Sequence, residues 1–364
     1  MDVLHLRGPV LVGPEDVRVE AWVVGGRITF ERPTAPGADV QELRGWVLPG
    51  LVDAHCHVGL GPGGAVDAAT TEQQALTDRD SGALLLRDAG SAADTRWVDS
   101  RPDLPRILRA GRHLARTRRY LRGLAEELEP ADLPAAVREQ ARRGDGWVKV
   151  VGDWIDRDSG DLAPCWDAAT LRAAAEAAHG EGARITAHQF GEDGVAELID
   201  AGFDGIEHGT GLTAATIARA AAAGVVVVPT LVNIATFPGI AERAEGRFPR
   251  YAAHMRALHA RRRATVREAW EAGVPVRAGT DAGSVLPHGL IVEEVAELAA
   301  AGLPAVAALD AATWAARRWL GADGLQEGAD ADLVVCPADP RADLGALRAL
   351  RAVVLRGAPL PAAG

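Results

Sequence analysis

The stretch Gly50-Leu51-Val52-Asp53-Ala54-His55-Cys56-His57 is an apolar run that ends in two histidines. It stands where the pattern of the chain changes. From Val47 onward, short runs rich in β-branched residues alternate with Ala-rich amphipathic segments. Short apolar runs of this kind are typical of buried strands, and their alternation with helices is typical of a parallel sheet. The sequence therefore predicts an α/β protein.

The alternation continues for eight units. Helical stretches such as 168–179 and 192–201 separate most of the expected strands, which are 50–57, 83–88, 106–110, 147–151, 184–188, 205–208, 225–230 and 276–281. Eight such units predict a (β/α)8 barrel of the TIM type over residues 48–322. The longest irregular connections, 111–130, 152–166 and 232–249, would then lie at the carboxyl ends of the strands, where active sites of such barrels are built.

The two chain ends have a different pattern. Residues 17–24 and 27–31 alternate around Gly25-Gly26, which indicates a β-hairpin. Strand patterns return at 331–336 and 352–356. We expect residues 1–47 and 323–364 to form together a small β-sandwich domain beside the barrel.

The chain contains a single lysine, Lys149, and 38 arginines. Lys149 lies in the apolar run 147–151, where a charged ammonium is costly. A desolvated lysine can lose its proton and act as a nucleophile, whereas arginine cannot. An Arg-rich composition could also leave one lysine by chance, but this does not explain its place in a buried strand. We predict that Lys149 is chemically required.

Ligand-type side chains end several of the expected strands. His55 and His57 are two apart on one strand and so point to the same face. An isolated histidine is more often a structural polar group than a ligand, so the prediction of a metal site depends on the joint pattern. The six candidate ligands are His55, His57, Lys149, His188, His208 and Asp281, from strands one, four, five, six and eight.

With these motifs, nearly the whole chain resembles the amidohydrolase superfamily, and within it the imidazolonepropionase-like and Xaa-Pro dipeptidase-like branch. The stretches that carry the resemblance are Leu48-Pro49-Gly50-Leu51-Val52-Asp53-Ala54-His55-Cys56-His57, Arg87-Asp88-Ala89-Gly90, Ile206-Glu207-His208-Gly209, Gly279-Thr280-Asp281-Ala282-Gly283, Ala311-Ala312-Thr313 and Gly328-Ala329-Asp330-Ala331-Asp332-Leu333-Val334-Val335.

The resemblance implies a binuclear metal-dependent hydrolase of a C–N amide bond, of the dipeptide or N-acyl amino acid type. In members with a lysine on strand four, the amine adds CO2, and the carbamate (N6-carboxylysine, here Lys149) bridges two divalent metals. His55, His57 and Asp281 would complete the shell of one metal, and His188 and His208 that of the other. Imidazole and carboxylate ligands suit Zn2+, with Fe2+, Mn2+ or Co2+ as alternatives. A metal-bridging hydroxide would attack the carbonyl, and Asp281 would transfer the proton to the leaving amine.

Three other functions stay open on the sequence alone. A cyclic amidase or deaminase is one, although deaminase-like members usually hold one metal and do not need the lysine. An esterase or lactonase could use the same metal centre. A catalytically inactive scaffold is the third, although such proteins typically lose ligands and none is missing here.

The expected substrate pocket departs from that of dipeptidase-like relatives. They often carry Gly-Gly-His after strand three, where this chain has Arg118-Arg119-Tyr120. The loops after strands three and seven contain Arg116, Arg118, Arg119, Arg247 and Arg250, which would suit a substrate with a free carboxylate. Solvation of two long loops is the alternative. The candidate substrate contacts are His113, Tyr120, Tyr251, His254 and His288, with surface packing as the alternative for the tyrosines.

Composition limits the partners. A net charge of −11 without a basic stripe argues against nucleic acid. The longest apolar stretch, 214–229, contains Arg219 and Gly224 and does not resemble a membrane span. The start of the chain lacks the pattern of a signal peptide, and three widely spaced cysteines fit a reducing compartment. We expect a cytoplasmic enzyme with a small-molecule substrate, and a homo-oligomer is compatible with the sequence.

Overall fold

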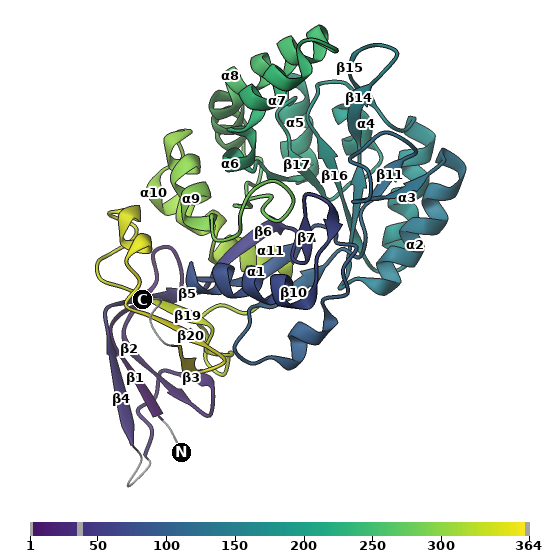
Figure 1. The fold of residues 1–364 in the computed structure, drawn as a ribbon. Helices are drawn as coiled ribbons and strands as arrows, with labels where there is room; N and C mark the ends of the chain where they lie inside the picture. Colours follow the sequence, from purple (N-terminus) through teal and green to yellow (C-terminus); the bar gives the residue numbers. More distant parts are fainter. Residues whose placement is uncertain (1–2, 35–38, 361–364) are drawn as a thin grey trace.

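The computed structural model describes residues 3–34 and 39–360 and has an α/β fold with mixed sheets (Figure 1). Two sheets consist of parallel strands only. The first has the order β10 (Arg106–Arg109), β9 (Ala83–Asp88) and β6 (Leu51–Cys56). The second has the order β12 (Glu126–Leu128), β11 (Leu114–Arg116), β13 (Trp147–Val151), β16 (Arg184–Gln189), β17 (Gly205–His208) and β18 (Val226–Val228).

Burial explains why these strands have near-continuous apolar sequences. All residues of β6, β9, β13 and β17 are buried, as expected for parallel strands that are covered on both faces. The predicted third strand, 106–110, is confirmed as β10, which pairs with β9, whereas the next parallel strand, β11, pairs with β13.

Residues 276–281 were expected as a regular strand, and this prediction is wrong. Within this segment the structure has only an isolated parallel bridge between Val276 and Val227. The segment still connects the two parallel sheets, since Arg277 N donates to Val227 O and Ala54 N donates to Ala278 O, both at 2.9 Å. The chain then turns away at Asp281, which has a left-handed φ of 60°. No regular ladder forms along the segment, which has single bridges at Val276 and, just beyond it, at Ala282.

Helices cover the parallel sheets (Figure 1). Their first residues are often fixed by side-chain caps, as at Asp67 and Asp167, which each accept a backbone N–H three residues on. The expected helix at 168–179 is confirmed. The one expected at 192–201 begins only after Gly194, whose φ is 91°. The helices are α1 (Ala68–Asp80), α2 (Leu133–Arg143), α3 (Ala168–Gly180), α4 (Val195–Asp200), α5 (Ala214–Ala223), α8 (Pro249–Glu271), α9 (Ile291–Ala300), α10 (Ala305–Ala311) and α11 (Trp314–Leu320).

All three connections that were predicted to be irregular contain regular structure. The first, 111–130, contains β11 and β12. The loop after β13 forms an antiparallel hairpin of β14 (Asp153–Asp156) and β15 (Asp161–Pro164). The connection after β18 forms α6 (Leu231–Ile234) and α7 (Phe237–Ala244). The remaining short elements are β7 (Leu60–Gly61), β8 (Gly64–Ala65), η1 (Arg96–Ser100), η2 (Pro130–Asp132) and η3 (Leu344–Arg348).

Both chain ends share one eight-stranded sheet. The expected hairpin around Gly25-Gly26 is confirmed, and both glycines have positive φ. Strand β19 pairs with β5, which brings the C-terminal strands beside the N-terminal ones at one end of the molecule (Figure 1). The strands are β1 (Val3–Leu11), β2 (Val17–Val24), β3 (Arg27–Thr29), β4 (Val40–Arg44), β5 (Trp46–Pro49), β19 (Leu333–Cys336), β20 (Ala352–Leu355) and β21 (Ala358–Pro359).

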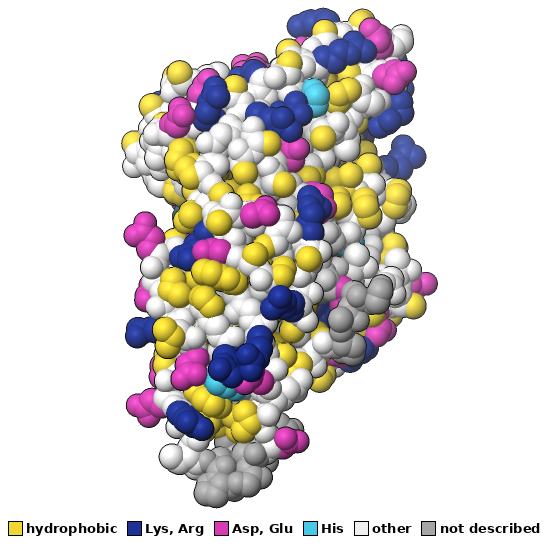
Figure 2. Space-filling model, turned by 90° about the vertical axis from the view of Figure 1, so that its left-hand side faces the viewer, with side chains coloured by type: hydrophobic (Ala, Val, Ile, Leu, Met, Phe, Trp, Pro, Cys, Tyr) yellow, Lys and Arg dark blue, Asp and Glu magenta, His cyan; other side chains and the backbone are white. Residues whose placement is uncertain are grey.

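The surface carries charges of both signs. On the face drawn in Figure 2, acidic and basic side chains are interspersed with hydrophobic ones. Across residues 3–34 and 39–360, every helix is too short or too polar to cross a bilayer.

Gly279 should be sensitive to substitution because the backbone packs closely around it. A Cβ atom there would lie 2.5 Å from Val228 Cγ1 and 2.7 Å from His55 N. Since overpacking a rigid site costs about 1–3 kcal/mol, Gly279→Ala should lower the free energy of unfolding by that amount in urea denaturation. Gly180→Ala is the control, as a Cβ at Gly180 meets no atom within 4 Å. Equal stability of the two variants would contradict this packing.

Candidate metal centre

Six ligand-type side chains converge at the carboxyl ends of the parallel strands. The five basic side chains are at most 5% exposed. They lie at the end of β6 and just after it, on β13, β16 and β17, and at the last residue of the 276–281 segment. They are His55, His57, Lys149, His188, His208 and Asp281.

The ligand atoms lie close together. His55 Nε2 is 3.3 Å from His57 Nε2, and Asp281 Oδ1 is 3.2 Å from the first and 3.0 Å from the second. Lys149 Nζ is 3.5 Å from His55 Nε2. His208 Nε2 lies 2.9 Å from His188 Nδ1, and ligand atoms of His55, His208 and Asp281 are all within 4.8 Å of one another.

Hydrogen bonds fix the orientation of the two imidazoles on strand β6. His57 donates its Nδ1–H to the carbonyl of Gly90 at 2.8 Å, and His55 donates its Nδ1–H to Glu207 at 2.8 Å. In the neutral rings, both Nε2 lone pairs therefore face each other and the Asp281 carboxylate. These lone pairs and the carboxylate oxygen are all hydrogen-bond acceptors, so a cation between them would stabilise the arrangement. Hydrogen bonds from Nδ1–H to a carboxylate or a backbone carbonyl are also typical of metal-binding histidines. The donor set thus fits divalent metal ions.

The second pair of histidines has a similar arrangement. His208 Nδ1 is 2.7 Å from Thr230 Oγ1, while its Nε2 faces His188. His188 Nε2 is buried without a hydrogen-bond partner. Burial lowers the pKa of both rings well below its usual range, so both are neutral and can offer lone pairs to a metal.

Lys149 is almost fully enclosed. Burial lowers the pKa of its amine to about 8, although Glu207 and Asp281 act in the opposite direction. A part of the amine is therefore neutral near pH 7, which is the form that can react as a nucleophile.

Asp281 is held by its backbone and by a neighbouring amide. Its Oδ2 accepts a hydrogen bond of 2.7 Å from Asn233 Nδ2, which leaves Oδ1 directed at the two imidazoles. Burial opposes ionisation, but protonated His55 and His57 rings that donate to the carboxylate hold the pKa of Asp281 well below its usual range. Asp281, His208 and Thr230 all have left-handed φ values, of 60°, 69° and 47°. Backbone strain of this kind tends to gather at functional sites.

A layer of supporting residues lies behind the ligands, and the sequence analysis assigned it no role. Glu207 accepts from His55 with one oxygen and from Arg87 with the other, at 2.6 Å. Asp53 accepts from the backbone N–H groups of His55 and Thr280. A signal was present in the sequence, because a charged residue inside an apolar strand, such as Glu207 or Arg87, needs a buried partner.

The predicted substrate contacts occupy different surroundings. The ring centroids of His113 and His57 are 5.7 Å apart, those of His113 and Tyr120 are 5.2 Å apart, and those of Tyr120 and His188 are 5.7 Å apart. His113 Nε2 is buried without a partner. These two residues therefore lie beside the metal centre, and substrate contact stays a prediction for them.

The other three candidates are more distant or already engaged. Tyr251 is buried in α8 against Phe190 and its neighbours. His288 Nδ1 is 2.7 Å from the buried carboxylate of Asp78. His254 uses both ring nitrogens, toward Asp161 at 2.9 Å and Glu192 at 2.8 Å. His254 thus has no ring nitrogen left for a substrate in this conformation.

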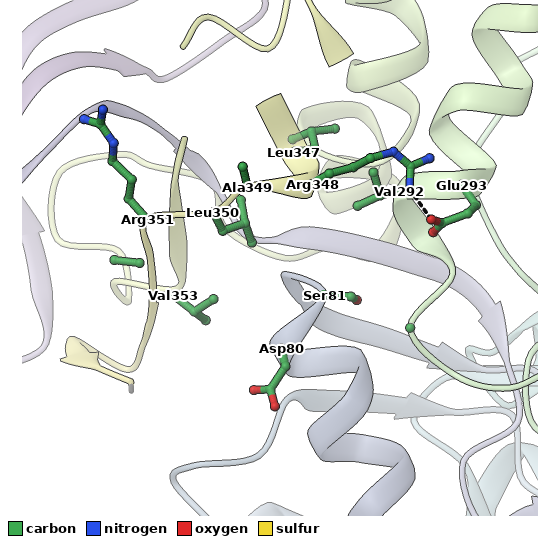
Figure 3. A pocket seen from close by; sticks show the side chains of 12 residues that line it. Asp80, Ser81, Val292, Glu293, Leu347, Arg348, Ala349, Leu350, Arg351 and Val353 are labelled. Carbon is green, nitrogen blue, oxygen red and sulfur yellow. Dashed lines mark hydrogen bonds and ion pairs between the residues drawn. The ribbon is translucent and has the colours of Figure 1, made fainter. Parts of the chain in front are cut away.

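One cavity lies away from these residues. It has a volume of about 440 Å3 and is lined by Asp80 and Ser81 at the end of α1, by Val292 and Glu293 of α9 and by 347–353 (Figure 3). Glu293 and Arg348 form an ion pair across its edge. Since none of the six candidate ligands lines this cavity, we do not assign it to the metal centre.

The fold and the site define an α/β protein with a buried candidate metal centre at the carboxyl ends of its parallel strands. The chain belongs to the amidohydrolase family, whose model matches residues 46–357. This agrees with the resemblance found in the sequence.

Individual relatives are similar over almost the whole chain. An uncharacterized protein of Mycobacterium tuberculosis (strain ATCC 25618 / H37Rv) is 58% identical over 97% of this chain and 95% of its own length. A crystal structure of a Xaa-Pro dipeptidase with methionine bound in its active site has a TM-score of 0.82 at 23% identity and covers 99% of both chains. A prolidase complexed with N-methylphosphonate-L-proline has a TM-score of 0.82 at 22% identity, covering 98% of this chain and 99% of its own. The two structures show a common fold.

The ion pairs of His254 should make stability depend on pH. The hydrogen bond to Glu192, joined by one to Asp161, raises the pKa of His254 to about 9 from its ordinary value of 6.5. A raised pKa in the folded state gives stability that is fully present below pH 6.5 and is lost as the pH rises through 9. The difference in unfolding free energy between the natural protein and His254→Gln should therefore shrink from pH 6 to pH 10, measured by urea denaturation.

His259→Gln, on the same helix, is the matched control. Burial lowers the pKa of His259, so its ring is neutral at high pH and its variant should show a constant difference above pH 7. A constant difference for His254→Gln across the same range would refute the role of these ion pairs.

Proposed function

We propose that this protein is a binuclear metal-dependent hydrolase of C–N amide bonds, acting on a dipeptide or an N-acyl amino acid with a free carboxylate. The observation that carries the proposal is the convergence of five imidazole and carboxylate ligands around Lys149, with both strand-β6 imidazoles oriented through Nδ1. Family membership supports a hydrolase. The dipeptidase and prolidase with the same fold support the choice of amide substrate.

The residues divide into two ligand sets. His55, His57 and Asp281 would hold one metal, and His188 and His208 the other, most readily as Zn2+. Lys149, as N6-carboxylysine, would bridge them. Bound divalent ions would supply Lewis-acid polarisation of a carbonyl and a water of lowered pKa. A deaminase is less well supported, because Lys149 lies within 3.5 Å of a ligand nitrogen.

In this proposal Asp281 moves the proton. Its Oδ1 faces the ligand nitrogens, while Asn233 restrains Oδ2. The carboxylate can take a proton from the attacking water and deliver it to the leaving amine, which is general acid–base catalysis. His113 and Tyr120 would border the substrate beside it.

We also infer that eight parallel segments close a barrel over 48–322, namely β6, β9, β10, β13, β16, β17, β18 and residues 276–281. Backbone hydrogen bonds from 276–281 to β18 on one side and to β6 on the other support this. The shared eight-stranded sheet supports a small β domain made from 1–47 and 323–364.

Lys149 provides the first test of the metal centre. Protein purified without chelators should contain about two divalent metals per chain by elemental analysis, as expected for a two-metal site. Lys149→Arg keeps the charge but cannot form a carbamate, so it should lose metal and activity. Lys149→Ala should regain metal and part of its activity with added short-chain carboxylates, which could replace the carbamate.

The carbamate itself can be checked by mass and density. A free amine at Lys149 between two occupied metal sites, or full activity with one metal per chain, would overturn the binuclear proposal.

Asp281→Asn tests the proton transfer. The amide keeps a ligating oxygen but cannot act as a base, so turnover should fall by about 10²–10⁴. Most of the metal should remain, as measured by elemental analysis of the same sample. Asp200→Asn, the same change at an exposed position of α4, is the control. Turnover within a few-fold of the natural protein would rule out this role for Asp281.

A further inference from the structure

A second cavity, of about 460 Å3, is rich in arginine and is lined by Tyr120, the residue whose ring lies beside His188 of the candidate metal centre. It lies between the β11–β12 connection and the tip of the β14–β15 hairpin. Arg118 and Arg122 line it from the first segment, Arg157 from the second, and Arg112 from the residues just before β11. Tyr120 is also part of its wall.

The arginines of this cavity lack acidic partners. Within residues 3–34 and 39–360, none of the four guanidinium groups has a carboxylate within ion-pair distance, in contrast to Arg119 beside them, which pairs with Asp156 at 3.1 Å. Arg112 donates to the carbonyl of Ala125, but its buried Nε has no partner. Four arginines against two glutamates, Glu126 and Glu127, give the wall a formal charge of +2.

The walls of the cavity are held in place by Arg119. It donates to the carbonyls of Trp154 and Ala163, at 2.9 and 2.8 Å, and so ties the β11–β12 connection to the β14–β15 hairpin. The predicted substrate contact by Arg119 therefore gives way to a structural role. A fixed frame brings Arg118 and Arg157 to the same cavity from different segments, which favours binding because less ordering is needed.

Tyr120 connects this cavity to the metal centre. Its ring lies edge-on to His113 and His188, with centroids 5.2 and 5.7 Å away. Tyr120 thus lies between the candidate metal centre and the arginines, and a substrate with its amide bond at the metal centre would reach the arginines along this ring.

We infer that the arginine-lined cavity binds the end of the substrate that carries the free carboxylate, and that this end is an acidic residue with two carboxylates, such as an aspartyl or glutamyl group. This rests on the proposed amide hydrolysis. A wall charge of +2 matches two carboxylates, and guanidinium groups bind carboxylates through paired hydrogen bonds. A prolyl or other neutral residue would leave part of that charge without a partner.

Kinetics on matched substrates test the inference. The value of kcat/KM should be at least about tenfold higher for N-acetylglutamate than for N-acetylglutamine, since the two differ in one carboxylate. In the double variant Arg118→Ala/Arg122→Ala this ratio should fall to near one, because the variant loses the preference for the second carboxylate. Arg138→Ala/Arg172→Ala removes the same charge from exposed positions of α2 and α3 and should keep the ratio. Equal rates on both substrates in the natural protein would overturn the inference.

Binding separates this inference from the proposed function. Calorimetric titration of the full chain with glutarate, a dicarboxylate, should give a dissociation constant at least about tenfold lower than with glutaramate, its monoamide. The arginine-cavity variant should lose this preference even if the protein hydrolyses neither substrate. The same loss in the control variant would show a general charge effect and overturn the site. Inorganic phosphate that binds more tightly than glutarate, through the same arginines, would replace the dicarboxylate assignment by a phosphate group.

Discussion

The buried ion pair between Arg87 and Glu207 connects the parts of this structure that the site depends on. Arg87 belongs to β9 of the three-stranded sheet, and Glu207 to β17 of the six-stranded sheet. Neither side chain is exposed, and Arg87 also donates to the carbonyl of Ala54 next to His55. The guanidinium lies about equally far from the rings of Trp147 and Trp319, at 5.0 and 5.1 Å. One contact thus joins two sheets and orients a candidate ligand.

A buried ion pair of this kind fixes the positions of its side chains but adds little to the stability of the folded protein. Moving both charges out of water costs about as much as their attraction returns, whereas removal of one partner costs about 3–5 kcal/mol. The remaining oxygen of Glu207 accepts from His55, and the ionised state is retained because Arg87 and His55 outweigh burial. The position of Glu207 fixes which nitrogen of His55 faces the cluster. The buried pair therefore costs desolvation energy but fixes the orientation of His55 at the site.

The sequence predicted those features that depend on local pattern. Buried parallel strands have continuous apolar runs, so β6, β9, β13 and β17 could be located, and the strand ends brought the candidate ligands together. The segment 276–281 failed as a strand because Gly279 permits a close approach to His55 and Asp281 turns the backbone, both of which are tertiary effects. Whether an arginine has an acidic partner likewise depends on residues that are distant in the sequence. Arg118 and Arg119 are neighbours in sequence, yet Arg119 is held by Asp156 and the hairpin carbonyls, whereas the Arg118 guanidinium faces a cavity.

Asn233 is held in position by residues that lie outside the candidate metal centre. Thr230 adopts a left-handed conformation directly before α6, and its hydroxyl contacts His208. Glu294, a fully buried residue of α9, accepts the backbone N–H groups of Leu231 and Val232, both at 2.9 Å.

These two contacts fix the first turn of α6, and this turn carries Asn233 to the carboxylate of Asp281. Burial raises the pKa of Glu294 to about 8, so its carboxyl is mostly uncharged near pH 7. It still accepts hydrogen bonds from a fixed position. The left-handed conformation of Thr230 is strained, and such a conformation persists only where the surrounding structure holds it in place. The hydrogen bonds to Glu294 provide this support. The orientation of Asp281 is therefore set by α9, an element that contributes no ligand to the site.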